Sequence, residues 1–178
     1  MIGRDVLLLI MANLKKEFSK IYDQYVDKIY RFVFLKVSSQ EVAQDITSET
    51  FLRGWDSLKN GNNVENPQAF LYQIARNLVT DHYRDKGRAQ FVSVETTPIE
   101  DPKQDIGKLA VLSSDVEVVR RSLAGLREDY QNVIIWHYLD DLPIPRVAKM
   151  LDRSEDATRV LLHRALESLR GKLPGGEA

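Results

Sequence analysis

Apolar residues recur along most of this chain at the three- and four-residue spacing of an amphipathic helix. Over residues 16–37 the apolar residues with this spacing include Phe18, Ile21, Tyr22, Tyr25, Val26, Ile29, Phe32 and Val33. That spacing puts them on one face of a helix, and the face must be buried against another element. No strand pattern or internal repeat competes with this reading. The sequence therefore predicts an all-α fold.

Two further helices are predicted in the first half of the chain, each marked by capping residues. Ser38 followed by Glu41 forms a capping box, and Gly61 ends the helix that begins there. Asn66, which is followed by proline, caps the next helix, and we expect that helix to run to about Arg84. The three helices together predict one small domain.

A second helical set follows a stretch without helical spacing. Residues 88–112 contain two prolines and no sustained period, which predicts a linker without a core of its own. Beyond it, Ser114 and Glu117 form another capping box. The helix that they begin has an apolar face made of Val116, Val119, Leu123 and Leu126. A helix over 128–139 then offers four residues for burial: Tyr130, Val133, Ile134 and Tyr138.

The last two predicted helices are short and close together. They span 144–151 and 155–170, and Ser154 is the expected N-cap of the second. A three-residue turn between two helices is typical of a helix-turn-helix. The predicted organisation is two small helical domains joined by a linker: 1–15 as an N-terminal extension, 16–88 as the first domain, 89–113 as the linker, 114–173 as the second domain with the helix-turn-helix, and 174–178 as a tail.

Composition excludes several classes of function. The 178 residues include no cysteine, so a disulfide scaffold, a cysteine-ligated zinc site and a thiol nucleophile are excluded. The three histidines do not have the spacing of a metal or catalytic motif, and we expect no enzyme activity, metal or cofactor. The net charge of −1 neither favours nor excludes nucleic acid. Residues 146–172, however, carry seven basic and four acidic side chains, a local excess that favours DNA.

The N-terminus contains a short apolar run over residues 6–11. It is far below the roughly 20 residues of a membrane span, and it does not have the flanks of a secretory signal. Met11 is an alternative start of the chain. We expect a cytoplasmic protein without membrane insertion.

Four segments, in order, resemble the extracytoplasmic function (ECF) group of bacterial sigma factors. Asp45–Trp55, DITSETFLRGW, resembles the group's D-I-x-Q-E-x-F-L-R-A-W helix. Phe70–Arg84, FLYQIARNLVTDHYR, is similar to W-L-Y-x-I-A-R-N-x-x-x-D-x-x-R, the most specific of the four patterns. Leu126–Ile134 resembles L-P-E-x-x-R-x-V, and Leu162–Ala165 matches L-H-R-A in the recognition helix. The resemblance spans nearly the whole chain.

The resemblance implies an alternative sigma factor that binds core RNA polymerase and directs it to specific promoters. The first domain would dock on the β′ clamp helices through Asp45, Ser48, Glu49, Phe51, Leu52 and Arg53. It would also melt and capture the non-template strand of the −10 element, through Asn66, Arg76, Asn77, Thr80, Asp81, Arg84, Lys86 and Arg88. The second domain would read the −35 element as duplex, through Arg146, Arg153, Ser154, Thr158, Arg159, His163 and Arg164. The linker would thread towards the polymerase active centre. The expected partners are core polymerase, including its β flap, promoter DNA and an anti-sigma factor.

The chain also departs from the group's pattern. Ser48 stands where the docking helix has glutamine, and Val160 and Leu161 replace two polar residues of the recognition helix. Glu155 and Asp156 add negative charge near the expected phosphates. The alternative reading is a sigma-like DNA-binding regulator that does not support initiation. A third possibility is that exposed Val160 and Leu161 meet a protein partner such as an anti-sigma factor.

Overall fold

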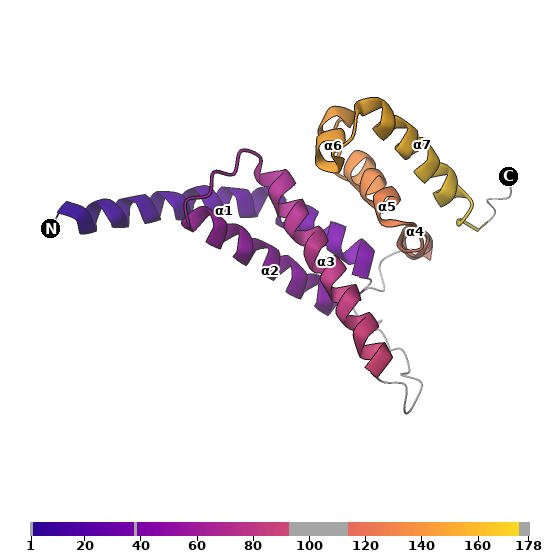
Figure 1. The fold of residues 1–178 in the computed structure, drawn as a ribbon, viewed down its shortest axis with the longest axis horizontal. Coiled ribbons are helices and arrows are strands. Elements are labelled where there is room, and N and C mark those ends of the chain that lie inside the picture. Colours follow the sequence, from indigo (N-terminus) through magenta and orange to yellow (C-terminus); the bar gives the residue numbers. More distant parts are fainter. Residues whose placement is uncertain (1, 38, 93–113, 175–178) are drawn as a thin grey trace. The chain divides into compact units, whose positions relative to one another are not determined.

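The computed structural model describes the backbone of residues 2–37, 39–92 and 114–174 and the side chains of residues 8–37, 39–87 and 117–174. Helices make up most of these ranges. They divide into two units, Met1–Thr96 and Thr97–Ala178. The first holds α1 (Ile2–Val37), α2 (Gln40–Lys59) and α3 (Pro67–Val92). The second holds α4 (Ser114–Ala124), α5 (Glu128–Ile134), the π-helical turn η1 (Ile135–Leu139), α6 (Ile144–Leu151) and α7 (Glu155–Arg170) (Figure 1). The described ranges contain no strand, which confirms the all-α prediction.

The first unit is a three-helix arrangement in which each helix packs against the other two (Figure 1). Its core includes Ile29, Phe32 and Val33 from the predicted apolar face of α1, together with Phe51 of α2 and Leu71 and Tyr72 of α3. Gly54 lies where α2 meets both neighbours, since a Cβ there would stand 3.1 Å from Leu71 Cδ2 and 3.7 Å from Phe18. At the other end the Tyr83 hydroxyl donates to the Lys36 carbonyl at 2.5 Å, which ties α3 to the end of α1.

Three predicted boundaries in this unit are wrong. The first helix begins at Ile2 rather than near residue 16, because the apolar run of residues 6–11 continues the helix without a breaker. The N-cap of α2 is Ser39, whose hydroxyl accepts from the Val42 amide, while Ser38 lies outside the described residues. The third helix continues past Gly87 to Val92, since a single interior glycine costs a helix only about 1 kcal/mol. The predicted cap of α3 is confirmed: Asn66 Oδ1 accepts from the Ala69 amide at 3.1 Å.

The second unit is packed around α5 and η1, which bring Val133, Ile135 and Trp136 into its core. The five-residue π-turn places one residue more per turn than an α-helix, and Tyr138, predicted to be buried, is 52% exposed. Val119, also predicted on the apolar face, is 42% exposed. His137 is half-buried, with Nδ1 2.9 Å from the Leu142 carbonyl. The predicted linker, residues 89–113, begins inside α3, which ends at Val92. Its remaining residues, 93–113, lie outside the described residues.

An ion-pair cluster on α4 replaces the second predicted capping box. Since α4 begins at Ser114 itself, Ser114 is not the residue before the helix, and Glu117 pairs instead with the buried Arg120 and the exposed Arg121. Hydrogen bonds from the Arg120 guanidinium, more than those from Arg121, hold the pKa of Glu117 at about 2 against partial desolvation. The cluster compensates the charge of a nearly buried arginine.

The helix-turn-helix agrees with its predicted boundaries. Helices α6 and α7 span Ile144–Leu151 and Glu155–Arg170, and the Ser154 hydroxyl caps α7 by accepting from the Ala157 amide at 3.2 Å. Asp152 in the turn has φ 53° and ψ 50°, the left-handed conformation that ends α6. None of the described helices is both long and apolar enough to cross a bilayer.

Candidate polymerase and nucleic-acid interfaces

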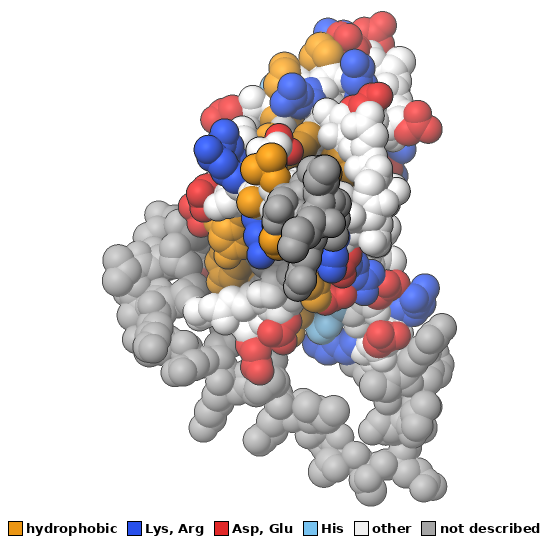
Figure 2. All heavy atoms as spheres, turned by 90° about the vertical axis from the view of Figure 1, so that its left-hand side faces the viewer, with side chains coloured by type: hydrophobic (Ala, Val, Ile, Leu, Met, Phe, Trp, Pro, Cys, Tyr) orange, Lys and Arg blue, Asp and Glu red, His pale blue; other side chains and the backbone are white. Residues whose placement is uncertain are grey.

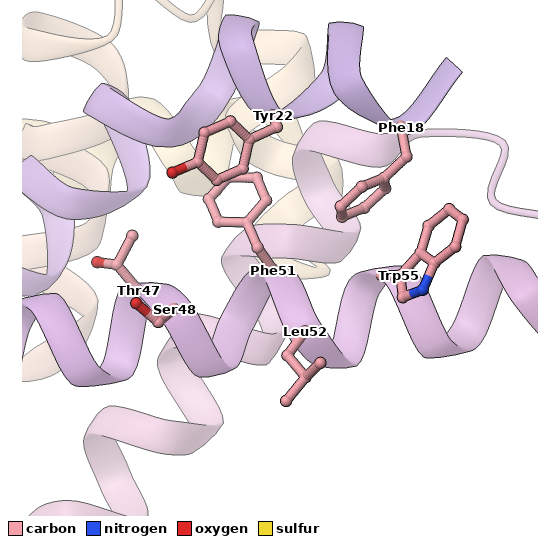
Figure 3. Close-up of a pocket in the computed structure, with 7 residues that line it drawn as sticks. All are labelled: Phe18, Tyr22, Thr47, Ser48, Phe51, Leu52 and Trp55. Carbon is pink, nitrogen blue, oxygen red and sulfur yellow. The ribbon is translucent and has the colours of Figure 1, made fainter. Parts of the chain in front are cut away.

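An apolar groove runs between α1 and α2. It has a volume of about 370 Å³ and is lined by Phe18, Tyr22, Thr47, Ser48, Phe51, Leu52 and Trp55, hereafter the groove residues. Figure 3 shows the rings of Tyr22 and Phe51 lying close together, and the Phe18 ring lying beside Trp55. The ring centroids of these two pairs are 4.8 and 5.3 Å apart. A second hollow of about 360 Å³ continues along α1 past Lys15 and Ser19.

The six residues predicted to bind polymerase all lie on α2, but they have different surroundings. Leu52 is 55% exposed at the edge of the groove, and Ser48 is exposed beside it. Phe51 is only 4% exposed and forms the floor of the groove, so its role is to shape the surface. Asp45 is exposed, and Glu49 pairs with Arg53 at 2.7 Å. These three form the charged stripe expected from their four-residue spacing.

Sequence reasoning missed the contribution of α1 to this groove. Phe18 and Tyr22 were placed on the buried face of the first helix, yet Tyr22 is 45% exposed and both line the groove. Their spacing of four residues, opposite Phe51 and Trp55 on the next helix, is the signal that could have found them. The surface therefore belongs to two helices rather than one.

The residues predicted to bind the −10 strand lie on α3 or cap it, and the structure brings four of them together. Asn77, Thr80, Asp81 and Arg84 share the face turned away from α1 and α2. Thr80 Oγ1 donates to the Arg76 carbonyl, and Arg84 pairs with Asp81 at 2.7 Å. Arg76 is half-buried and Asn66 acts as the helix cap. Lys86 is exposed, but it continues the face that packs on α1 and α2. The side chain of Arg88 lies outside the described residues.

The residues predicted to bind the −35 duplex surround the second helix of the helix-turn-helix. Arg146, His163 and Arg164 are exposed. Arg153 in the turn pairs with Asp129 at 2.9 Å. Arg159 donates to two carboxylates of its own helix, Glu155 at 3.1 Å and Asp156 at 2.8 Å.

Two expectations about the recognition helix are wrong. Thr158 is completely buried and its hydroxyl donates to the Ser154 carbonyl at 2.9 Å, so the side chain is removed from any DNA surface. Leu161, expected to be exposed beside Val160, is 6% exposed. Both follow from helical spacing, since 158, 161, 162 and 165 share the inward face of α7.

On the face shown in Figure 2, basic and acidic side chains alternate rather than forming one large patch of either sign. Figure 2 shows Lys and Arg side chains interspersed with Asp and Glu on the face in view. Over the described ranges, no cluster of three or more His, Asp and Glu side chains is arranged to hold a metal ion. The arrangement suits local contacts from single helices to a polar or nucleic-acid partner.

Comparison with known proteins places both units in one family. Residues 21–89 match Sigma-70 region 2, and residues 117–169 match Sigma-70, region 4. The ECF RNA polymerase sigma factor BldN of Streptomyces coelicolor is 30% identical over 167 residues, covering 88% of this chain and 60% of BldN. SigW of Bacillus subtilis, another ECF sigma factor, is 27% identical over 165 residues, covering 88% of both chains.

Two solved structures share the fold. The sigma factor RpoE, in complex with the anti-sigma factor NepR from Bartonella quintana, has a TM-score of 0.68 at 19% identity, over 88% of this chain and 96% of RpoE. CnrH, in complex with the cytosolic domain of CnrY, has a TM-score of 0.62 at 18% identity, over 87% and 86% of the two chains. With region 2 and region 4 both matched and ECF sigma factors as relatives, the chain belongs to the ECF group of the sigma-70 family.

Proposed function

We propose that this chain is an alternative sigma factor that binds core RNA polymerase through the groove between α1 and α2 and directs it to promoters. The observation that carries the proposal is the groove itself, which offers exposed Leu52 and Tyr22 next to the charged residues Asp45, Glu49 and Arg53. An apolar centre with a polar rim is the usual anatomy of a protein interface. A helix of the polymerase clamp fits such a surface by laying its apolar side chains into the groove.

The exposed face of α3 supports the capture of the −10 non-template strand. The Asn77 amide can pair with a base edge, and Arg84 lies two turns further on the same face to meet the backbone. A base read in this way must leave the stack, and unstacking costs less on a strand that is already single. Lys86, which is exposed near the end of the helix, then acts as a phosphate contact, and the same role is proposed for Arg88.

The helix-turn-helix supports reading of the −35 element as duplex. In this motif the second helix enters the major groove, and residues of its N-terminal half reach base edges. Arg159 and His163 lie on the outward surface of α7, Arg164 adjoins them, and Arg146 and Arg153 flank the turn. The cap role of Ser154 fixes the start of α7 and leaves Thr158 to the core.

We further propose that an anti-sigma factor covers the groove in competition with polymerase. RpoE is similar in fold and was solved in complex with an anti-sigma factor. A surface that is apolar enough for the clamp also suits an amphipathic helix of such a partner. The β flap of polymerase is the proposed contact of the second unit. Because the proposed partner is RNA polymerase, we also propose that the protein is cytoplasmic.

The experiment is transcription by purified core polymerase on a genomic promoter library, with and without the full chain. Specific initiation at promoters that share a −10 and −35 pair is expected. Binding to duplex DNA without any binding to core would contradict the proposal and favour the sigma-like regulator, which Ser48 in place of the docking-helix glutamine leaves open. Core polymerase without the added chain controls for sigma factors that contaminate the core preparation.

A further inference from the structure

One apolar side chain on the recognition helix remains unexplained by the roles above. Val160 is 51% exposed in the middle of α7, whereas Leu161 and Leu162 on the inward face of the same helix are buried. Valine is also a weaker helix former than the residues usual on an exposed face. A single exposed valine is common on a protein surface, so what distinguishes Val160 is its place on the recognition helix.

The place of Val160 on α7 decides which complex. It is one turn after Asp156 and one turn before Arg164, on the surface that a helix-turn-helix turns into the major groove. Arg159 is the basic residue next to Val160, and its guanidinium already donates to Glu155 and Asp156. In the major groove the apolar group that distinguishes one base from the others is the C5-methyl of thymine.

We propose that Val160 reads a thymine methyl in the −35 element and so sets the sequence preference of this sigma factor. The inference rests on the proposed function, because it assigns a base contact to the same helix. Arg164 and His163 then contact the DNA backbone and groups next to it, while Val160 discriminates thymine from the other bases. A methyl group buried against the valine side chain gains about as much as one buried methylene, which corresponds to about a fourfold change in affinity.

The experiment removes the methyl from the DNA rather than from the protein. A −35 element is first selected by the holoenzyme from a randomised promoter library, and each thymine in it is then replaced singly by deoxyuridine. We expect one replacement to weaken promoter binding about fourfold. Val160→Ala should weaken binding to the thymine promoter by a similar factor and abolish the deoxyuridine effect, because the two changes remove the same contact.

A matched variant controls for the loss of an exposed valine. Val119 on α4 is exposed to 42%, is in the same unit and lies outside the helix-turn-helix, so Val119→Ala should keep the full deoxyuridine effect. A selected element without a thymine, or a Val160→Ala loss that is equal on thymine and deoxyuridine, would overturn the inference and assign Val160 to a protein partner. Because the selection itself requires specific initiation, its failure would instead sink the proposed function.

Discussion

Truncation of Leu52 tests the groove as the polymerase surface. The side chain is 55% exposed, and full burial of a leucine is worth about 1.5–3 kcal/mol, so the part still to be buried amounts to about 1 kcal/mol. We therefore expect Leu52→Ala to weaken binding to core polymerase about fivefold. The free energy of unfolding should change by less than about 0.5 kcal/mol, since leucine and alanine are both good helix formers and the site is on the surface.

The assay is competition between unlabelled variant and labelled wild-type chain for a limiting amount of core polymerase. Leu9→Ala is the matched control: Leu9 is 72% exposed on α1 and lies outside the groove, so its truncation should leave the affinity unchanged. Equal affinities for Leu52→Ala and wild type, or equal losses for the two variants, would refute the assignment of the groove to polymerase.

Three further predictions concern the second unit. The pKa of Glu117 is held at about 2, below its ordinary 4.5, so the stabilisation that it gives is complete above about pH 4.5 and is lost as the pH falls towards 2. Glu117→Gln should cost the unit about 1–2 kcal/mol at pH 7 and flatten its acid dependence, as measured by amide hydrogen exchange; an unchanged acid limb would contradict this. Asp152→Gly should stabilise the same unit by about 0.5–1 kcal/mol, because glycine adopts the left-handed conformation of that residue without a Cβ penalty, and Asp152→Ala should give no gain. Replacing Glu155 and Asp156 by Gln and Asn should strengthen duplex binding about fivefold at low salt and less at high salt, since each carboxylate repels nearby phosphate by about 0.5 kcal/mol; anisotropy of labelled duplex at two salt concentrations checks it.

The helices and the helix-turn-helix were predictable because their signals are local. The Ser154 and Asn66 caps, the periodic core of α1 and the turn before α7 depend on residues within a few positions of one another. A helix boundary was not predictable where two adjacent residues can both serve as the N-cap, as with Ser38 and Ser39 before α2. Tyr138 was misplaced for a different reason, since the π-turn changes the helical register without a breaker in the sequence.

The interfaces themselves stay predictions, but the structure shows which of their side chains are exposed and which are buried. Family resemblance placed polymerase contacts on α2, but the groove also needs Tyr22 from α1, and pairing between two helices is a tertiary property. Thr158 shows the reverse case, because a polar residue in a recognition helix can be buried when its hydroxyl has a backbone carbonyl to bond.

The two carboxylates at the start of α7 also affect how the protein searches a genome. Glu155 and Asp156 pair with Arg159. If α7 binds duplex as proposed, their charge would repel phosphate in the same way on every DNA sequence. Nonspecific binding consists almost entirely of such phosphate contacts, whereas a specific site adds base contacts to them. Under the proposed function, the acidic pair would thus shorten residence on the millions of competing sites and keep more of the protein available for polymerase.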